Sequence, residues 1–351
     1  MEMDGGAQVG ESIVSPTPDA FSKSAVRSAW VASRYRDVQA VLADERLQVG
    51  TVPEGGLVGT ISWLRASVSR FINGAEHRRR RERAIAELRR LDPAHLRSAA
   101  YRRSHAVLRR AGQQGEHIDI MSLLARRTPM AAMAAGLGIA DPERAAEDVI
   151  AVAAGYFPGS DAATERAAEQ ALAQLLSLLE PAELELIVTR IALMVQGCDA
   201  TAGLIGITLQ TLQDATPAGA DPGWSTDALL LEALRRRPPL RASRRVTREP
   251  MTFRGQRLAA GEMVVCDVEV ANQDPSVFHD PSRFDPDRRG EASLAFGYGV
   301  RPCPGQAQAL GLAAGVVDAV RESCRFLPGE PLDYESSQAL RVPARLEVVL
   351  S

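Results

Sequence analysis

Residues 296–305 read Phe-Gly-Tyr-Gly-Val-Arg-Pro-Cys-Pro-Gly, and this stretch decides how the rest of the chain is interpreted. Cys303 stands among glycines and prolines, directly before an apolar segment from Gln306 to about Val320 that predicts a helix. Glycines let a backbone approach a flat ligand closely, and backbone N–H groups and the positive end of a following helix stabilise a thiolate. A thiolate held in such a turn can serve as the axial ligand of a haem iron.

The stretch resembles the haem-binding signature of the cytochrome P450 family, F-x-x-G-x-R-x-C-x-G. All five fixed positions are present, namely Phe296, Gly299, Arg301, Cys303 and Gly305. In a chain of this composition a chance match has a probability on the order of 10⁻⁴. A lone cysteine after a glycine turn is typical of a buried structural residue, but the complete signature is not. The resemblance implies a b-type haem (heme b) whose iron is bound by the Cys303 thiolate.

A further segment matches a motif of this family in the expected order. Glu232-Ala233-Leu234-Arg235 fits E-x-x-R, in which the two charged side chains lie one helical turn apart. Alone this pair carries little weight, since such pairs are common on solvated helices. The resemblance implies that Glu232, Arg235 and an arginine of the Pro/Asp-rich segment 272–288, here Arg283, hold the core together on the proximal side of the haem.

Four basic residues match the family's haem-propionate ligands. His77 and Arg81 fit H-x-x-x-R, and on a helix residues i and i+4 lie on one face, so both can point at one anionic group. By resemblance that group is a haem propionate, and Arg245 and Arg301 match two further propionate ligands. If Cys303 were absent, we would interpret His77, on such an arginine-rich segment, as part of a solvated surface.

The chain departs from the family on its longest apolar segment, about Pro181 to Leu212, which predicts the distal helix. Where the family carries A/G-G-x-D/E-T-T, residues 196–201 read Gln-Gly-Cys-Asp-Ala-Thr. Gly197 and Asp199 align, but Ala200 stands where most members have the threonine whose hydroxyl organises water and delivers protons.

Thr201 does not replace that hydroxyl, because one residue further is about 100° around a helix. Asp199 is therefore the remaining candidate proton donor, the alternative being a surface ion pair. A polar group of the substrate is expected to hold the water instead. Gln196, where a small residue is customary, either narrows the distal pocket, donates a hydrogen bond or points away.

Composition excludes several classes of protein. The 351 residues are 45% hydrophobic and 24% charged, with a net charge of −3, which argues against a nucleic-acid-binding protein. Four cysteines without a C-x-x-C pair exclude a disulfide scaffold and make structural zinc unexpected. The start of the chain has no basic segment followed by an apolar one, and Arg190 and Asp199 interrupt the most apolar stretch. We expect no membrane span and a cytoplasmic location.

The expected architecture is mainly α, a cytochrome P450 fold with small β-sheets and the haem between the long distal helix and the proximal cysteine loop. Residues 1–25 are expected to be a flexible arm, and residues 26–351 a single haem domain. The expected helices cover about 37–42, 75–107, 119–171 with a break near 157–159, 181–212, 225–237 and 306–320. The expected strands cover 29–32, 251–258, 263–266 and 346–350.

The expected function is oxidation of a natural-product intermediate, by hydroxylation or atypical substrate-assisted chemistry. Electrons would come from a separate ferredoxin and ferredoxin reductase, since no flavin or iron–sulfur segment is present. The family's first helix looks truncated, and the stretch between Phe157 and Pro181 looks too short for the customary lid helices. A short lid indicates an open pocket, a large or carrier-bound substrate, or a surface completed by another protein.

Two other functions stay open at this point. One is a non-oxidative homologue that acts as a helper subunit of a glycosyltransferase, which the lost threonine and the short lid would fit. The other is a haem protein with non-redox or peroxide-driven chemistry. The intact signature argues against the helper, because a helper has no need of a haem cradle.

Overall fold

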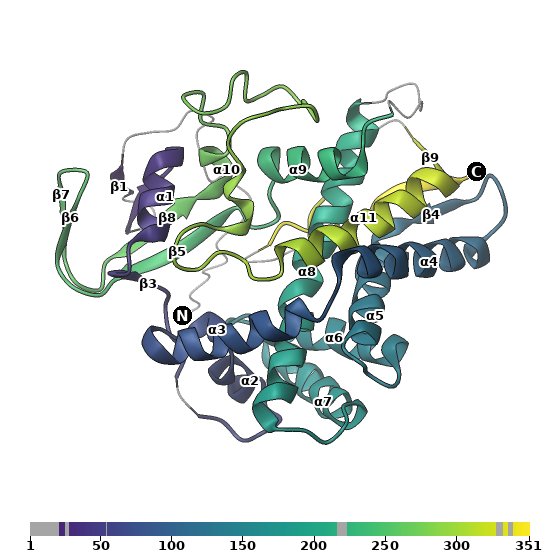
Figure 1. Cartoon of the computed structure of the whole chain (residues 1–351), viewed down its shortest axis with the longest axis horizontal. Helices are drawn as coiled ribbons and strands as arrows, with labels where there is room; N and C mark the ends of the chain where they lie inside the picture. The colour runs from purple at the N-terminus through teal and green to yellow at the C-terminus, as the bar shows by residue number, and fades with distance from the viewer. Residues whose placement is uncertain (1–20, 25–27, 54, 216–222, 328–332, 336–339) are drawn as a thin grey trace, which may run out of the picture.

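A long helix, α8 (Leu184–Ala215), runs through the middle of the molecule, and the other helices pack around it (Figure 1). The computed structural model describes residues 21–24, 28–53, 55–215, 223–327, 333–335 and 340–351. Its other helices are α1 (Tyr35–Ala43), α2 (Ile61–Ser67), η1 (Ser69–Phe71), α3 (Gly74–Arg89), α4 (Pro93–Ala111), η2 (Met121–Ala125), α5 (Arg127–Gly136), α6 (Pro142–Tyr156), α7 (Ala162–Leu178), α9 (Thr226–Arg236), α10 (Val268–Ala271), η3 (Leu294–Phe296) and α11 (Gln306–Ser323).

Three small sheets complete the described part of the chain. The strands are β1 (Ser22–Ser24), β2 (Ala29–Ala32), β3 (Leu47–Gln48), β4 (His117–Asp119), β5 (Ala242–Thr247), β6 (Met251–Phe253), β7 (Gln256–Leu258), β8 (Met263–Asp267), β9 (Cys324–Phe326) and β10 (Glu347–Leu350). The largest sheet has the order β1-β2-β8-β5-β3, in which β2 and β8 run parallel and β5 is antiparallel to β8. The mainly α architecture with small sheets is therefore confirmed.

The first strand corrects one predicted boundary. Ser22–Ser24 pair with β2, and Phe21 is buried with its ring stacked on Trp30 at 5.2 Å between centroids. The flexible arm predicted over residues 1–25 therefore extends too far along the chain, because Phe21 packs on Trp30 and Ser22–Ser24 belong to the sheet. Residues 1–20 lie outside the described residues.

The stretch 75–107, which was predicted to be helical, is divided between two helices, α3 and α4. Asp92 accepts a hydrogen bond from the Ala94 N–H at 3.0 Å, and Pro93 occupies the first position of α4. A carboxylate cap followed by proline starts a new helix, and it breaks the chain after α3. The break predicted near 157–159 is confirmed, because α6 ends at Tyr156 and α7 begins at Ala162.

Helix α11, which follows the cysteine loop, is held close to α4 by two glycines. A Cβ on Gly315 would lie 2.2 Å from the Arg97 carbonyl oxygen, and one on Gly311 would lie 2.5 Å from the Pro93 carbonyl oxygen. Only glycine permits such an approach. This contact places the start of α11, and with it the cysteine loop, against the end of α3.

Of the described helices, α8 is the one long and apolar enough to cross a membrane, and 72% of its most apolar window is buried inside the protein. Burial of that extent is typical of a core helix. Around it lies the larger of two apolar clusters, while the smaller one lies between α1 and the five-stranded sheet.

Candidate functional site

The cysteine loop leaves η3 and turns back on itself before α11 begins. The Cys303 N–H donates to the Phe296 carbonyl at 2.7 Å, which closes the loop. Gly297 and Gly299 have φ values of +76° and +65°, which residues with side chains rarely adopt. A Cβ on Gly299 would also lie 2.5 Å from the Ala43 Cα, so the loop needs glycine there to pack on the end of α1.

Cys303 is the exposed member of the four cysteines, and the other three are buried. Solvent reaches Cys303, although the surrounding chain still desolvates its thiol. Desolvation raises the pKa of Cys303, and the Gly305 N–H and the charges of Arg81 and Arg70 oppose that rise. These donors and charges favour the thiolate that a metal would need.

Two glycines leave space on either side of where a flat ligand would lie. A Cβ on Gly305, after Cys303, would have Leu88 at 3.7 Å as its nearest neighbour, and one on Gly197 of α8 would have nothing within 4 Å. Contacts within the described chain therefore do not explain these glycines. A flat group held between the cysteine loop and α8 would explain both.

His77 marks a cluster of cations beside the cysteine loop. Its side chain is 5% exposed. Burial and the charges of Arg301, Arg81 and Arg78 lower the pKa of His77 to about 4, so the imidazole is neutral at pH 7. Desolvation, with the charges of Arg245 and Arg81, likewise lowers the pKa of Arg301 to about 10.

No carboxylate among the described residues lies within ion-pair distance of Arg81, Arg245 or Arg301. Arg301 donates to the Ile72 carbonyl at 2.6 Å and to Asn73 Oδ1 at 2.8 Å. Arg245 donates to Ser243 Oγ and the Arg244 carbonyl, and Arg81 donates to the Pro302 carbonyl. Guanidinium groups that are buried, as in Arg245, or half-buried, as in Arg81 and Arg301, are costly without anions. The cluster is therefore suited to a dianion such as the two propionates of haem.

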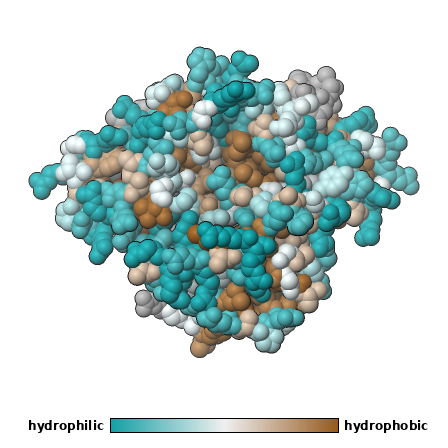
Figure 2. Space-filling model, viewed as in Figure 1, coloured by the Kyte–Doolittle hydropathy of each residue, from teal (hydrophilic) through white to brown (hydrophobic). Residues whose placement is uncertain are grey.

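The surface around this cluster is strongly polar. Hydrophilic side chains cover α3 in the space-filling view (Figure 2). Several of its arginines pair with glutamates, as Arg79 does with Glu76 at 2.7 Å and Arg83 with Glu183 at 2.8 Å. Arg81 differs from these neighbours, because it turns toward the cysteine loop and stays without a carboxylate.

On α8, one face is less buried than the others. Leu193, Gln196, Gly197 and Ala200 are half-buried at the spacing of a helical face, whereas Thr201 is 2% exposed. Gln196 has no hydrogen-bond partner among the described residues, so its amide is available to a ligand. Thr201 lies away from this face, as its position in sequence predicts.

Asp199 was predicted to be either a proton donor or a member of an ion pair, and the structure shows it in an ion pair. Arg126, at the start of α5, donates through Nε to Asp199 Oδ1 at 2.8 Å and through a terminal nitrogen to Glu335 at 2.9 Å. Sequence reasoning missed Arg126 and Glu335, because no motif joins them to Asp199. Arg126 is 73 residues from Asp199 and 209 residues from Glu335 along the chain. A proton donor at Asp199 would have to exchange this partner first.

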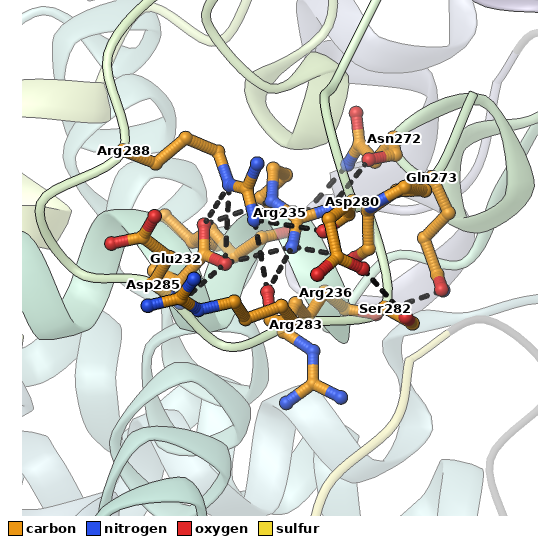
Figure 3. A network of polar contacts seen from close by, with 12 residues as sticks. Glu232, Arg235, Arg236, Asn272, Gln273, Asp280, Ser282, Arg283, Asp285 and Arg288 are labelled. Carbon is orange, nitrogen blue, oxygen red and sulfur yellow. Dashed lines mark hydrogen bonds and ion pairs between the residues drawn. The ribbon is translucent and has the colours of Figure 1, made fainter. Parts of the chain in front are cut away.

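Behind the cysteine loop, Glu232 and Arg235 form a buried pair with an N–O distance of 2.7 Å (Figure 3). The third member is Arg288, which lies 3.4 Å from Glu232. The prediction of Arg283 in this role is therefore wrong. Its carbonyl accepts hydrogen bonds from Arg235 and Arg288, while its own side chain points away from the cluster (Figure 3).

The comparisons with known proteins agree with this geometry. The family model Cytochrome P450 matches residues 225–310. Over 92% of its length this chain is 27% identical to the mycinamicin IV hydroxylase/epoxidase of Micromonospora griseorubida, of which it covers 89%. A shorter match, 41% identical over 108 residues, is to Protein AknT of Streptomyces galilaeus, and it covers 29% of this chain and 24% of that protein. The crystal structure of P450BioI with a fatty-acid-loaded acyl carrier protein has a TM-score of 0.76 at 20% identity, over 94% of this chain and 95% of that one.

The fold, the exposed cysteine and the arginines without carboxylate partners define a haem-thiolate protein. The matching family model and the relatives agree with this class, and the chain is an enzyme of the cytochrome P450 type, an oxidoreductase that carries haem on a cysteine thiolate. The expectations for family, fold class, enzyme type and cofactor are confirmed.

Proposed function

We propose that this enzyme oxidises a natural-product intermediate at a haem bound by Cys303. The observation that carries the proposal is the solvent-reachable Cys303 beside three arginines that have no carboxylate partner. A haem ligated by a thiolate supplies the activation of dioxygen when bound. A relative that aligns along most of this chain is named as a hydroxylase/epoxidase of mycinamicin IV, which supports the substrate class.

In this proposal each residue of the chain has a separate task. Cys303 binds the iron, while Arg81, Arg245, Arg301 and neutral His77 hold the propionates. Gln196, Gly197 and Ala200 form the distal wall toward the substrate. Because Ala200 has no hydroxyl and Asp199 is held by Arg126, a polar group of the substrate orders the water that passes protons.

The test is the absorption spectrum of the reduced, CO-bound protein after expression with ample haem. We expect the long-wavelength Soret band of a thiolate-ligated haem. A colourless protein would contradict the proposal and favour the glycosyltransferase helper. A haem-loaded protein that never turns over with any electron donor would favour non-redox or peroxide-driven chemistry.

Haem retention tests the cation cluster. Replacing Arg301 by alanine removes one donor to the propionates, and charge-assisted hydrogen bonds each contribute about 1.5–3 kcal/mol, so haem affinity should fall by roughly tenfold or more. Arg81→Ala should have a similar effect. Haem transfer to apomyoglobin measures it, with Arg102→Ala, an exposed arginine of α4, as the control. Equal transfer rates in all three variants would place Arg81 and Arg301 outside the cofactor site.

Coupling of electron use to product tests the role of Ala200. With the true polar substrate, the wild-type protein should convert most NAD(P)H into product, and an analogue without the polar group should give mostly peroxide. Ala200→Thr restores a hydroxyl to the distal face and should rescue the analogue more than the true substrate. The measurement is product formed per NAD(P)H consumed with a surrogate ferredoxin system. Equal coupling of wild type with both compounds would refute substrate-assisted proton delivery.

We further propose that a ferredoxin and a ferredoxin reductase supply the electrons and that the protein acts in the cytoplasm.

The stretch between Phe157 and Pro181, expected to be too short for the customary lid helices, holds the 17-residue helix α7, which packs on α6 and α2. Only residues 179–183 separate it from α8. A short connection of this kind supports a large substrate, a carrier-bound one, or a protein partner at that edge.

A further inference from the structure

Arg70 carries a charge that nothing in the described chain neutralises. It lies in η1, between α2 and α3, with its guanidinium 5.8 Å from the ring centroid of Phe71 and 5.1 Å from that of Phe157. The side chain is half-buried, and among the described residues it forms no hydrogen bond or ion pair. Stacking on aromatic faces attracts a cation but satisfies none of its N–H donors.

A nearby arginine shows what a structural role looks like in this region. Arg65 donates to the carbonyl oxygens of Gly155, Tyr156 and Phe157 and pairs with Glu165 at 3.1 Å. It thereby caps the end of α6, where carbonyl groups lack partners within the helix. Arg70 reaches the same helix end without taking any such partner, so capping does not account for it.

A second polar group without a partner in this region is the hydroxyl of Tyr156, the last residue of α6. Tyr156 is 0% exposed, and its hydroxyl has no hydrogen-bond partner in the described structure. Its ring centroid lies 5.8 Å from that of Phe71 and 5.6 Å from that of Phe157. Burial raises the pKa of Tyr156, so the group remains an O–H donor. Buried hydroxyl groups without partners are rare and call for an explanation.

The segment that carries Arg70 borders the proposed haem site. The charge of Arg70 acts on the phenol of Tyr156, on the guanidinium of Arg245 and on the thiol of Cys303. The chain directly after η1 also meets the cation cluster, because Arg301 donates to the Ile72 carbonyl and to Asn73 Oδ1. The segment that carries Arg70 therefore contacts a residue proposed to hold the haem.

We propose that Arg70 and Tyr156 form a subsite for a carboxylate of the substrate, an inference that rests on the proposed function. A guanidinium and an O–H group offer donors to both carboxylate oxygens, and the rings of Phe71 and Phe157 exclude water around them. A propionate could supply the same chemistry, but Arg81, Arg245 and Arg301 already provide three charges for the two propionates. The Tyr156 hydroxyl is shielded from solvent, so the proposed subsite requires a neighbouring side chain to move when the carboxylate binds.

The test uses the haem-loaded full-length chain and three probes, phenylbutyrate, phenylhexanoate and phenyloctanoate, each with its primary amide. Binding is measured by calorimetry and by the change in haem absorption. We expect wild type to bind at least one carboxylate about tenfold more tightly than the matching amide. Arg70→Gln should remove that preference, Arg70→Lys should keep part of it, and Arg102→Gln should leave it unchanged.

Tyr156→Phe separates binding from structure. Removing a hydroxyl that has no partner should not lower the thermal midpoint of the ligand-free protein, yet it should weaken carboxylate binding several-fold. A lowered midpoint with unchanged binding would show a structural role and overturn the assignment of Tyr156.

Two other outcomes would overturn the subsite. One is that wild type binds no carboxylate of the series more tightly than its amide. The other is that Arg70→Gln loses haem as readily as Arg301→Gln does, since Arg70 would then serve a propionate. The CO-bound spectrum of wild type distinguishes these outcomes from a failure of the proposed function. This spectrum depends on Cys303 and haem but requires no substrate.

Discussion

Replacing Cys303 by serine should abolish the thiolate-type spectrum of the reduced, CO-bound protein while leaving most of the fold in place. The effect should be complete, because no other described cysteine can take over. Cys198, Cys266 and Cys324 are buried, and desolvation raises the pKa of each. A serine hydroxyl does not ionise at neutral pH, so the iron loses its anionic ligand.

Cys324→Ser is the matched control, since Cys324 lies in β9 at the far end of α11. It should keep both haem and spectrum. Haem content is measured separately by pyridine haemochrome, so that loss of the ligand is distinguished from loss of haem. A serine variant of Cys303 that retains the thiolate-type band would assign the ligand to another residue.

The largest loss of stability should come from breaking the buried pair behind the cysteine loop. Glu232 and Arg235 are 4% and 3% exposed, and Glu232 also accepts from the Asp285 N–H at 3.1 Å and pairs with Arg288. Glu232→Ala leaves two guanidinium groups and a backbone N–H without that acceptor. Removing one partner of a buried ion pair costs about 3–5 kcal/mol. For a domain stable by roughly 5–15 kcal/mol, that is a large share of the total.

Chemical denaturation followed by circular dichroism measures this loss on the haem-loaded protein. Glu147→Ala provides the comparison, because Glu147 pairs with Arg127 at 3.0 Å on the surface and both side chains are exposed. An exposed pair contributes about 0–1 kcal/mol, so its midpoint should barely move. Similar midpoints for the two variants would mean that the Glu232 cluster does not hold the proximal side together.

Local chemistry explains why the sequence predicted the cysteine loop well. Gly297 and Gly299 adopt left-handed backbone conformations, and Cys303 closes the loop on Phe296 within eight residues of chain, so the signature contains most of the contacts that shape it. The break before α7 and the strand Ala29–Ala32 were likewise predicted from nearby residues.

Errors arose where several chemically equivalent residues compete. Arg283 and Arg288 lie on the same segment, and both are arginines that could reach Glu232. Arg288 takes the role in the structure, because Arg283 presents its backbone carbonyl to Arg235 and Arg288 while its side chain points away. The first strand was missed for a similar reason, since only the stacking of Phe21 on Trp30 shows that this short segment joins the sheet.

The sequence by itself determined the family resemblance, the cysteine that can bind a haem iron and the loss of the distal hydroxyl at Ala200. These follow from residue identities at fixed spacing along one segment. Only the tertiary structure decided that Asp199 is tied to Arg126 and Glu335, and that Arg70 and Tyr156 lie together without partners. Whether a charged or polar side chain is paired depends on residues far along the chain and on burial, and neither can be read from local spacing.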